Sequence, residues 1–565
     1  MQQHVFTIAK ICSHYGVEHA VICPGSRSAP LVFAFTQNKK IKCYSVIDER
    51  SAAFMAMGMA QQLQKPVVLI CTSGTACLNF FPAIAEAFYQ KIPLLIISAD
   101  RPPELLNQQD GQMIMQKGVF GKHVLGSHEL LCYEHDKIDY QLTEKIVTKA
   151  LQETMQNSGY GPVHINAPFS EPLYNLNSLV SIPKLHLLNE LQIPPLASAH
   201  LFQQEMINAW LKSHRRMLIV GQLPVSEKLK IVLETLQNQD DVVIIADVVS
   251  NQHQSANVPL FDSILQFVSW HELKDLQPDF IISIGGPLVS KSLKSWLKTQ
   301  KPAFHFRIQR AADLVDTYNN VTHFIRSGEL EFLEAFAERN RFRQTFMKPY
   351  AADWKMYTKK VTTAINNFVE KEIWCEPAVV QHLLNAIPEK SQLQLSNSSV
   401  VRYASWLGLT HKELQVYGNR GTSGIDGVIS TAIGSARIQM QTTVTLLTGD
   451  LSLFYDRNAF WQQELPLNLR IIVLNNRGGN IFEWIDGPSD HPDELNYFTT
   501  PQQQSVKLLT QQYGINYFIC NNFNDLGSIL WHFYKPQDQM AILELPFFNA
   551  ENVENIKLFK NMKVL

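Results

Sequence analysis

The stretch LTGDLSLFYDRNAFWQQELPLNLRIIVLNNRGGNIF, residues 447–482, decides the expected fold. An apolar run at 444–447 ends in Gly449-Asp450, and a second run at 469–474 ends in Asn475-Asn476. About one helix's length of chain separates the runs, which predicts a strand, helix, strand unit with a parallel crossover. Parallel strands end at one edge of a sheet, where open α/β folds bind ligands. The stretch therefore predicts an α/β fold with a binding site at the two polar pairs.

These two strand ends carry the groups that a divalent cation prefers. A carboxylate from Asp450, an amide oxygen from Asn476 and a loop carbonyl at Gly478 are hard oxygen ligands, suited to Mg²⁺ or Mn²⁺ beside a phosphate. Glycines at 478 and 479 let the backbone approach that phosphate. The alternative is an ordinary strand-end aspartate followed by a turn, and this stretch by itself leaves both interpretations open.

The composition bounds the class of protein. A chain of 565 residues is too long for a single core, which favours several domains. The formal net charge of −2 gives no general electrostatic case for nucleic acid or a membrane surface. Eight cysteines without a CxxC pair fit a reducing compartment, and the N-terminus lacks a signal pattern. No apolar run is long enough to cross a membrane. We expect a cytoplasmic protein.

Alternating strand and helix patterns divide the chain into three doubly wound α/β domains with mostly parallel sheets. We place them at 1–185, 200–345 and 365–565, with a linker at 187–199 and a charged helical stretch at 329–360. Strands of the first domain are expected at 20–23, 43–47, 67–71 and 93–98. The central domain begins near residue 216 and is expected to close at the run FHFRIQ, 304–309.

The segment CYSVIDERSAAFMAMGMAQQ, residues 43–62, places Asp48-Glu49 where a strand ends and a helix begins. An acid in the first turn of a helix is favoured by the helix dipole, so these residues suit a purely structural role. The helix that follows is rich in alanine and methionine and suits close packing. A carboxylate at such a strand end also suits catalysis, and the other motifs decide between the two.

Further motifs together resemble a known enzyme group. The turn Thr72-Ser73-Gly74 and the segment ISADRPPEL at 97–105 resemble the pyrimidine-binding domain of thiamine diphosphate (ThDP) decarboxylases and synthases. Within that group, CPGSRSAPL at 23–31, NRGTSGIDG at 419–427 and GDLS at 449–452 are similar to the SEPHCHC synthase family of menaquinone biosynthesis. The resemblance covers essentially the whole chain. Leu451, where the general diphosphate motif has glycine, is also typical of this branch.

This resemblance implies a reaction and a cofactor. The family is a ThDP-dependent transferase that decarboxylates 2-oxoglutarate and adds the resulting succinyl semialdehyde–ThDP carbanion to isochorismate in a 1,4-addition, which releases CO₂ and gives SEPHCHC. Glu49 then serves as the catalytic acid that pairs with the aminopyrimidine ring. ThDP and its metal imply the cofactor residues Glu49, Ser73, Gly74, Ile425, Gly449, Asp450, Leu451, Ser452 and Ile481, with Asp450, Asn476 and Gly478 on the metal.

Both substrates are acidic, and arginine binds carboxylates through paired hydrogen bonds. The resemblance assigns to isochorismate Arg27, Arg101, Gln112 and Lys291, and to the 2-oxoglutarate side Ser398, Arg402 and Arg420. Just beyond the metal loop, the apolar side chains of Ile481, Phe482 and Ile485 are expected to line the pocket and to exclude water. Ser292 stands where the family often has a basic residue after the lysine. A single arginine in isolation is as well explained by a surface ion pair.

The remaining expectations concern assembly and alternatives. The family implies a homodimer or homotetramer with active sites at subunit interfaces. The central domain has runs such as MLIVG but no GxGxxG, so we expect no flavin or dinucleotide there. One rival is a different 2-keto acid decarboxylase or carboligase of the same fold. Another is a non-catalytic nucleotide-binding regulator, which would need neither Glu49 nor the Asp450/Asn476 pair.

Overall fold

The computed structural model describes residues 4–109, 111–132, 139–156, 159–174, 200–238, 242–340, 350–409, 413–548 and 550–564. The chain forms two compact units. The first contains residues 1–195, 419–441 and 452–469, and the second contains 196–418, 442–451 and 470–565. The expected linker at 187–199 lies outside the described residues.

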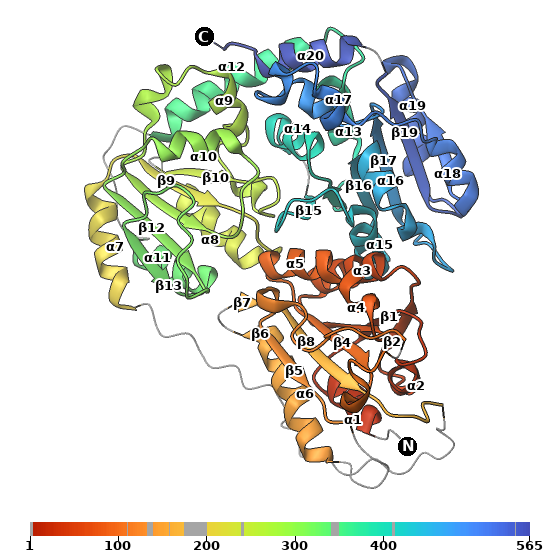
Figure 1. Cartoon of the computed structure of the whole chain (residues 1–565). Helices are drawn as coiled ribbons and strands as arrows, with labels where there is room; N and C mark the ends of the chain where they lie inside the picture. Colours follow the sequence, from red (N-terminus) through yellow and green to blue (C-terminus); the bar gives the residue numbers. More distant parts are fainter. Residues whose placement is uncertain are drawn as a thin grey trace. The chain divides into compact units, whose positions relative to one another are not determined.

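The first unit is built on a six-stranded parallel sheet, drawn red to orange in Figure 1, with the order β2-β1-β3-β4-β8-β5. Its strands are β1 (His19–Ile22), β2 (Lys42–Ser45), β3 (Val67–Cys71), β4 (Leu94–Asp100), β5 (Gly126–Glu129) and β8 (Pro162–Pro168). β1 to β4 confirm the four predicted strands. A small antiparallel pair, β6 (Met155–Gln156) and β7 (Gly159–Tyr160), stands apart from the sheet.

Helices cover the two faces of this sheet because its strands are apolar on both sides. On one face, α1 (His4–His14), α2 (Ala29–Gln37) and α6 (Tyr140–Thr154) bury a core with Ile22, Ile70 and Ile97. On the other lie α3 (Glu49–Leu63) and α5 (Phe81–Gln90), preceded by the short α4 (Thr75–Asn79).

A helix from much later in the chain completes the first unit. α15 (Val428–Ile438) packs along α3, and both are shown in Figure 1. Glycines permit the close approach, because a Cβ at Gly58 would come within 2.2 Å of the Thr431 carbonyl oxygen. The alanine- and methionine-rich sequence of α3 thus has the close partner that small residues predict.

The second unit contains two sheets. The central sheet is parallel, in the order β10-β9-β11-β12-β13. Its strands are β9 (Arg216–Val220), β10 (Val242–Ala246), β11 (Phe280–Ile284), β12 (Phe304–Gln309) and β13 (His323–Arg326). The prediction that this sheet closes at 304–309 was wrong by one strand. β13 is short and half exposed, so it lacks the buried apolar run that marked the others.

The other sheet has the order β15-β14-β16-β17-β19-β18, and its strands are β14 (Gln392–Leu395), β15 (Gln415–Tyr417), β16 (Val444–Gly449), β17 (Leu469–Asn475), β18 (Asn516–Ile519) and β19 (Ala541–Pro546). β16 and β17 are neighbours, as residues 447–482 predicted. The segment between them is irregular, because it holds only the short helix α16 (Asp450–Tyr455) and a 3-10 turn at Arg457–Phe460.

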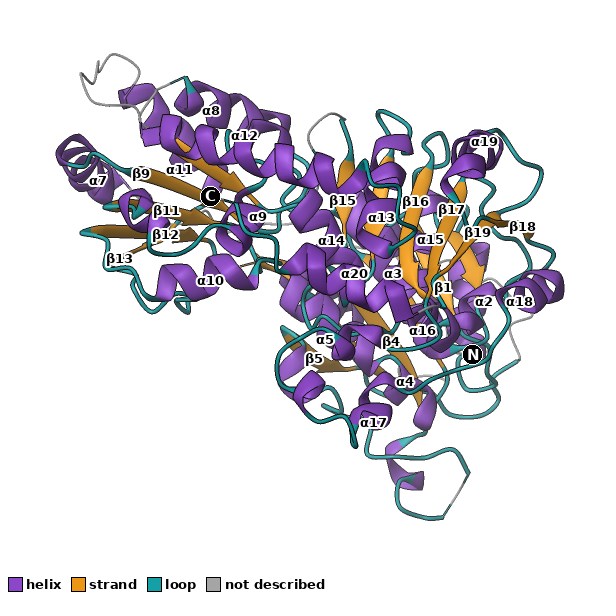
Figure 2. Cartoon of the chain, turned by 90° about the horizontal axis from the view of Figure 1, so that it is seen from above, coloured by secondary structure: helices purple, strands orange, loops and turns teal. Residues whose placement is uncertain are grey.

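Helices flank both of these sheets, as the purple and orange elements of Figure 2 show. The central sheet carries α7 (His200–Lys212), α8 (Glu227–Gln237), α9 (Phe261–Phe267), α10 (Lys291–Lys298), α11 (Glu329–Asn340) and α12 (Tyr350–Val369). The other sheet carries α13 (Glu376–Ala386), α14 (Ser399–Leu407), α17 (Leu495–Thr499), α18 (Val506–Tyr513), α19 (Phe523–Tyr534) and α20 (Ala550–Lys560). No helix in these described ranges is long and apolar enough to cross a membrane.

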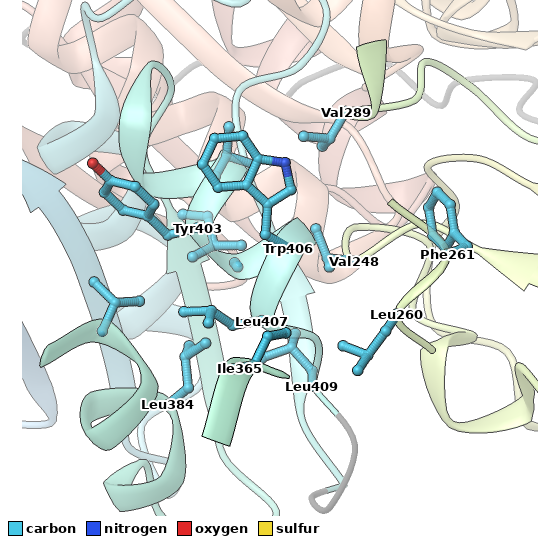
Figure 3. Packing of buried hydrophobic residues seen from close by; sticks show 14 of the residues in the cluster. Val248, Leu260, Phe261, Val289, Ile365, Leu384, Tyr403, Trp406, Leu407 and Leu409 are labelled. Atoms are coloured by element: carbon cyan, nitrogen blue, oxygen red, sulfur yellow. The ribbon is translucent and has the colours of Figure 1, made fainter. Parts of the chain in front are cut away.

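One continuous core joins the two sheets of the second unit. Trp406 and Leu407 of α14 belong to the same buried cluster as Val248, Phe261 and Val289 of the central sheet's loops and helices (Figure 3). Burying side chains of this size stabilises the fold by roughly 1.5–3 kcal/mol each. α14 is therefore held from both sides, which matters because it carries Arg402.

Candidate active site

In the first sheet, the strand order reverses between β1 and β3, and loops at such a switch point form binding sites. The loop after β1 carries Pro24 to Arg27, and the loop after β3 carries Thr72 to Gly74. The two loops touch, since a Cβ at Gly25 would lie 2.2 Å from the Thr72 Cβ. Two of the motifs singled out in the sequence are thus brought together by the fold.

Ser73 and Gly74 sit at the end of β3 in a polar environment. The Ser73 hydroxyl is buried and has no hydrogen-bond partner among the residues that the structure describes. Gly74 adopts φ +86°, and its N–H donates to Gln116 Oε1 at 3.2 Å. A Cβ at Gly74 would approach the Gln112 carbonyl oxygen at 3.1 Å, so Gln112 lies beside this turn. An unsatisfied buried hydroxyl next to a glycine turn fits a polar ligand.

Arg101 and Arg27 flank the same edge. Arg101 follows β4, and its Nη2 donates to the Gly111 carbonyl at 2.9 Å, next to Gln112. Arg27 is only 5% exposed, and its guanidinium donates to the Phe169 carbonyl at 2.8 Å and pairs with Glu171 at 3.2 Å. The fold therefore gathers three of the four residues predicted for isochorismate, namely Arg27, Arg101 and Gln112.

Glu49 is the first residue of α3 and is half buried. Burial raises the pKa of its carboxyl above the ordinary value. Asp48 is the N-cap, and its Oδ1 accepts a hydrogen bond from the Ser51 N–H at 2.9 Å. Asp48 therefore supplies the N-cap hydrogen bond of α3, and Glu49 is not needed for it.

The loop NRGTSGIDG, 419–427, is held by a residue that sequence reasoning missed. Glu86 of α5 is buried and accepts hydrogen bonds from the N–H groups of Gly421 and Thr422 at 2.7 and 2.6 Å. Arg420 is the second residue of this loop. Ile425 is 38% exposed, so it is not a core residue, and an exposed aliphatic side chain between glycines fits contact with a ligand.

In the sheet that contains β16, the order reverses between β14 and β16. The loop after β14 leads into α14, and Arg402 of that helix donates from Nη1 to the Ser398 carbonyl at 2.6 Å. Ser398 has φ +72°, a backbone conformation that non-glycine residues seldom adopt and that often marks functional sites. Ser398 and Arg402 are thus brought together, whereas Arg420 belongs to the other compact unit.

Gly449 ends β16 and Asp450 begins α16 at the same switch point. A Cβ at Gly449 would meet no atom within 4 Å, so the backbone there faces open space. Asp450 is buried, and burial raises the pKa of its carboxyl to about 6. Its Oδ2 accepts from Gln502 Nε2 at 2.6 Å, while the Gln502 N–H donates to the Arg477 carbonyl at 3.0 Å. Gln502, also missed from the sequence, therefore links the loops that follow β16 and β17.

Asn476 follows β17 and donates from Nδ2 to Glu376 Oε1 at 2.8 Å. Its Oδ1 is buried and has no hydrogen-bond partner within the described part of the chain. A desolvated carboxylate and an unpartnered amide oxygen at the ends of adjacent strands are the ligands that a hard cation takes. Gly478 is tightly packed, with a Cβ there falling 2.7 Å from the Thr499 carbonyl oxygen. These residues fit the expected metal and diphosphate.

The remaining predicted residues lie as follows. Ile481 is buried, and Phe482 and Ile485 are half buried against the core of the second unit. Leu451 and Ser452 are in the first turn of α16. Lys291 is exposed at the first position of α10, where the helix dipole disfavours a cation, and Ser292 bonds to Gln266 at 3.2 Å. Asp262 links the start of α10 to α14, because it accepts hydrogen bonds from the N-cap Ser290 at 2.5 Å and from Ser405 at 2.6 Å.

Comparison with known proteins agrees with this chemistry. Residues 5–119 match the family model "Thiamine pyrophosphate enzyme, N-terminal TPP binding domain", and residues 191–395 match "Middle domain of thiamine pyrophosphate". Thiamine pyrophosphate is ThDP under another name.

Whole-chain relatives point to one enzyme. The 2-succinyl-5-enolpyruvyl-6-hydroxy-3-cyclohexene-1-carboxylate synthase of Cytophaga hutchinsonii is 39% identical over 562 residues, covering 99% of this chain and 98% of the relative. The synthase of Flavobacterium johnsoniae is 36% identical, and the match covers 95% of this chain and 95% of the relative. The synthase of Desulfotalea psychrophila is also 36% identical, and the match covers 96% of this chain and 98% of the relative. The predicted ThDP cofactor class is confirmed, and the chain belongs to the 2-succinyl-5-enolpyruvyl-6-hydroxy-3-cyclohexene-1-carboxylate (SEPHCHC) synthase family of thiamine diphosphate enzymes.

Proposed function

We propose that this protein decarboxylates 2-oxoglutarate and joins the remaining four-carbon unit to isochorismate, giving SEPHCHC and CO₂ for menaquinone biosynthesis. It would use ThDP with Mg²⁺ or Mn²⁺. The observation that carries the proposal is the pair formed by the buried Asp450 carboxylate and the unpartnered Asn476 amide oxygen at adjacent strand ends. A plain α/β binding module has no need of such a pair.

The residues that would hold the cofactor follow from the site. Asp450, Asn476 and the Gly478 carbonyl would bind the metal, with the diphosphate in the open space at Gly449 and near Leu451 and Ser452. Ser73, Gly74, Ile425 and Ile481 would contact the rings. When bound, ThDP supplies a nucleophilic carbon and an electron sink for decarboxylation. Glu49, with its raised pKa, would share a proton with a ring nitrogen of the aminopyrimidine.

The arginines would sort the two substrates. Arg402, with the Ser398 carbonyl fixing its guanidinium, would bind the far carboxylate of 2-oxoglutarate together with Arg420. Arg27, Arg101 and Gln112, gathered at the edge of the first sheet, would bind isochorismate. Lys291 would add a positive charge, and Ser292 beside it adds none. Phe482 and Ile485 would exclude water and so strengthen these ion pairs.

We also propose that the active form is a homodimer or homotetramer with active sites at subunit interfaces. Each subunit would consist of the three predicted domains. Glu49 and Asp450 belong to different compact units of the chain. Co-expression of Glu49→Gln and Asp450→Ala chains tests this arrangement. If one site takes these residues from two chains, mixed dimers regain one intact site. No recovery above either variant alone would contradict the shared site.

The activity itself is tested by turnover of 2-oxoglutarate and isochorismate with ThDP and Mg²⁺, following CO₂ and loss of both substrates. Omission of isochorismate and replacement of 2-oxoglutarate by pyruvate are the controls. Turnover of pyruvate at an equal rate would favour the rival 2-keto acid carboligase. Absence of any ThDP-dependent turnover would overturn the proposal.

A further inference from the structure

Glu376 is a buried carboxylate that no assignment so far uses. It is 1% exposed and occupies the first position of α13, where the helix dipole favours a negative charge. Its Oε1 accepts from Asn476 Nδ2 at 2.8 Å and Asn552 Nδ2 at 3.0 Å, and its Oε2 accepts from the Tyr403 hydroxyl at 2.7 Å. Three segments therefore converge on this one side chain, namely the loop after β17, α20 and α14.

The geometry decides which way the Asn476 amide faces. A carboxylate only accepts hydrogen bonds, so the amide must present its NH₂ group to Glu376. The amide oxygen is then directed away, and this is the buried Oδ1 atom that has no partner in the described residues. With the opposite orientation, two oxygens would face each other and the metal side would receive NH₂, which cannot bind a cation.

We infer that Glu376 is a positioning residue for the cofactor metal, because it holds the Asn476 amide with its oxygen toward the cation site. The inference rests on the proposed function and deepens it. Groups that orient a metal ligand typically change metal affinity by about 10–100-fold when they are altered. Glu376 also bonds to Tyr403, the neighbour of Arg402, so one carboxylate contacts both the metal ligand and the helix proposed to bind 2-oxoglutarate.

The neighbouring Asn475 offers a matched control. Its Nδ2 donates to Glu544 at 2.6 Å, and Glu544 also accepts from the Tyr517 hydroxyl at 2.5 Å. This is the same arrangement of glutamate, asparagine and tyrosine. The Asn475 Oδ1, however, already accepts from the Arg477 N–H at 3.1 Å, so it is not directed to a cation.

Two substitutions distinguish the effect of the position of the Glu376 side-chain oxygens from the effect of its negative charge. Glu376→Gln keeps the length and an oxygen that accepts from Asn476 and Asn552, while its NH₂ can donate to the Tyr403 oxygen. Glu376→Asp keeps the charge but retracts the carboxylate by one methylene, away from Asn476. The readout is Mg²⁺ affinity at fixed ThDP, measured by calorimetry on the full-length protein, with thermal unfolding in the absence of metal as the check on folding.

If Glu376 positions Asn476, Glu376→Asp weakens Mg²⁺ binding by about 10–100-fold, and Glu376→Gln stays near the wild type. Glu544→Asp, the matched control, leaves Mg²⁺ affinity unchanged. Weak Mg²⁺ binding by Glu376→Gln together with normal binding by Glu376→Asp would overturn the inference, because only the charge would then matter. It is also overturned if neither variant changes the Mg²⁺ affinity.

If both variants bind Mg²⁺ weakly, the double variant Glu376→Gln/Asn476→Ala decides. If either variant fails to fold, Glu376→Ala and Glu376→Ala/Asn476→Ala replace them. Binding no weaker than in Asn476→Ala alone supports action through Asn476, and additive losses overturn it. Failure of the wild type to bind ThDP with Mg²⁺ would instead count against the proposed function, so the two ideas fail separately.

Discussion

Gly434 of α15 lies against the backbone of Met55 in α3, so closely that a Cβ at 434 would come within 2.1 Å of the Met55 carbonyl oxygen. The contact is reciprocated by Gly58 of α3 against Thr431 of α15. It joins segments far apart in the sequence and supports the helix that begins at Glu49. The backbone oxygen cannot turn aside as a flexible side chain could.

We predict that Gly434→Ala lowers the free energy of unfolding by about 1–3 kcal/mol or more, as overpacked interiors do. Denaturant unfolding measures the change. Gly527→Ala is the control, because Gly527 is an exposed residue in the interior of α19 with open space for a Cβ. That substitution should raise stability by about 0.5–1 kcal/mol. Equal stability of Gly434→Ala and the wild type would show that α3 and α15 are not packed as closely as this contact indicates.

For catalysis, Glu49→Gln should bind ThDP nearly normally and lower kcat by ~10²–10⁴, since an amide cannot exchange the proton that the carboxyl carries. Steady-state kinetics at saturating ThDP measures the effect. Glu227→Gln is the matched control, because Glu227 is also the first residue of a helix but is 78% exposed. Wild-type turnover by Glu49→Gln would remove Glu49 from the catalytic role.

For the metal, Asp450→Ala should abolish retention of ThDP unless Mg²⁺ is greatly raised, because the site loses its charged oxygen ligand. Asn476→Ala should have the same effect more mildly, since it removes a neutral oxygen. Equilibrium dialysis of ThDP across a Mg²⁺ series gives both values. If both variants held ThDP normally after removal of metal by a chelator, the cation site would have to lie elsewhere.

Arg402→Ala and Arg27→Ala should affect the reactions of different substrates. Losing a paired carboxylate contact in a dry pocket weakens binding by ~10². Arg402→Ala should slow CO₂ release from 2-oxoglutarate even without isochorismate. Arg27→Ala should spare that release and impair only product formation.

Arg27 also bonds to Phe169 and Glu171, so the stability of Arg27→Ala must be measured in parallel. Glu171→Gln removes the ion pair and leaves the guanidinium in place, which makes it the control. If Arg27→Ala blocked CO₂ release as severely as Arg402→Ala, the proposed division of the substrates would be wrong.

The pH dependence of stability should reflect His305, which is buried and neutral. Asn320 Oδ1 lies 2.6 Å from Nδ1 and the Ser283 hydroxyl 2.8 Å from Nε2, so Nδ1 donates and Nε2 accepts. Burial lowers the pKa of His305 from 6.5 to about 4. The unfolded chain therefore binds the proton first as pH falls. The contribution of neutral His305 to the free energy of unfolding is therefore complete above pH 6.5. It is lost progressively as the pH falls from 6.5 to about 4.

The measurement is urea unfolding at several pH values across this window. His305→Gln should reduce the slope of unfolding free energy against pH by up to about 1.4 kcal/mol per pH unit. Burial also lowers the pKa of His164, to about 3. In His305→Gln, His164 therefore still makes the unfolding free energy depend on pH. An unchanged slope in His305→Gln would contradict the neutral assignment.

The sequence by itself determined the parallel α/β character of the chain, the polar ends of β3, β4, β16 and β17, and the position of Glu49 at a helix start. These features are local: apolar runs make buried strands, and a polar or glycine residue ends them. The family was also readable, because its motifs are contiguous. The domain boundaries and the roles of individual site residues remain predictions.

Only the tertiary structure decided which side chains support the site. Glu86, Gln502 and Glu376 lie far in sequence from the residues they hold, at Gly421, Asp450 and Asn476. Their carboxylate and amide groups have no periodic pattern that would mark them. A partner in a hydrogen bond is set by which loops meet at the edge of a sheet, and that depends on strand order. The reversal of order between β14 and β16 is therefore what places Ser398 and Asp450 at one switch point.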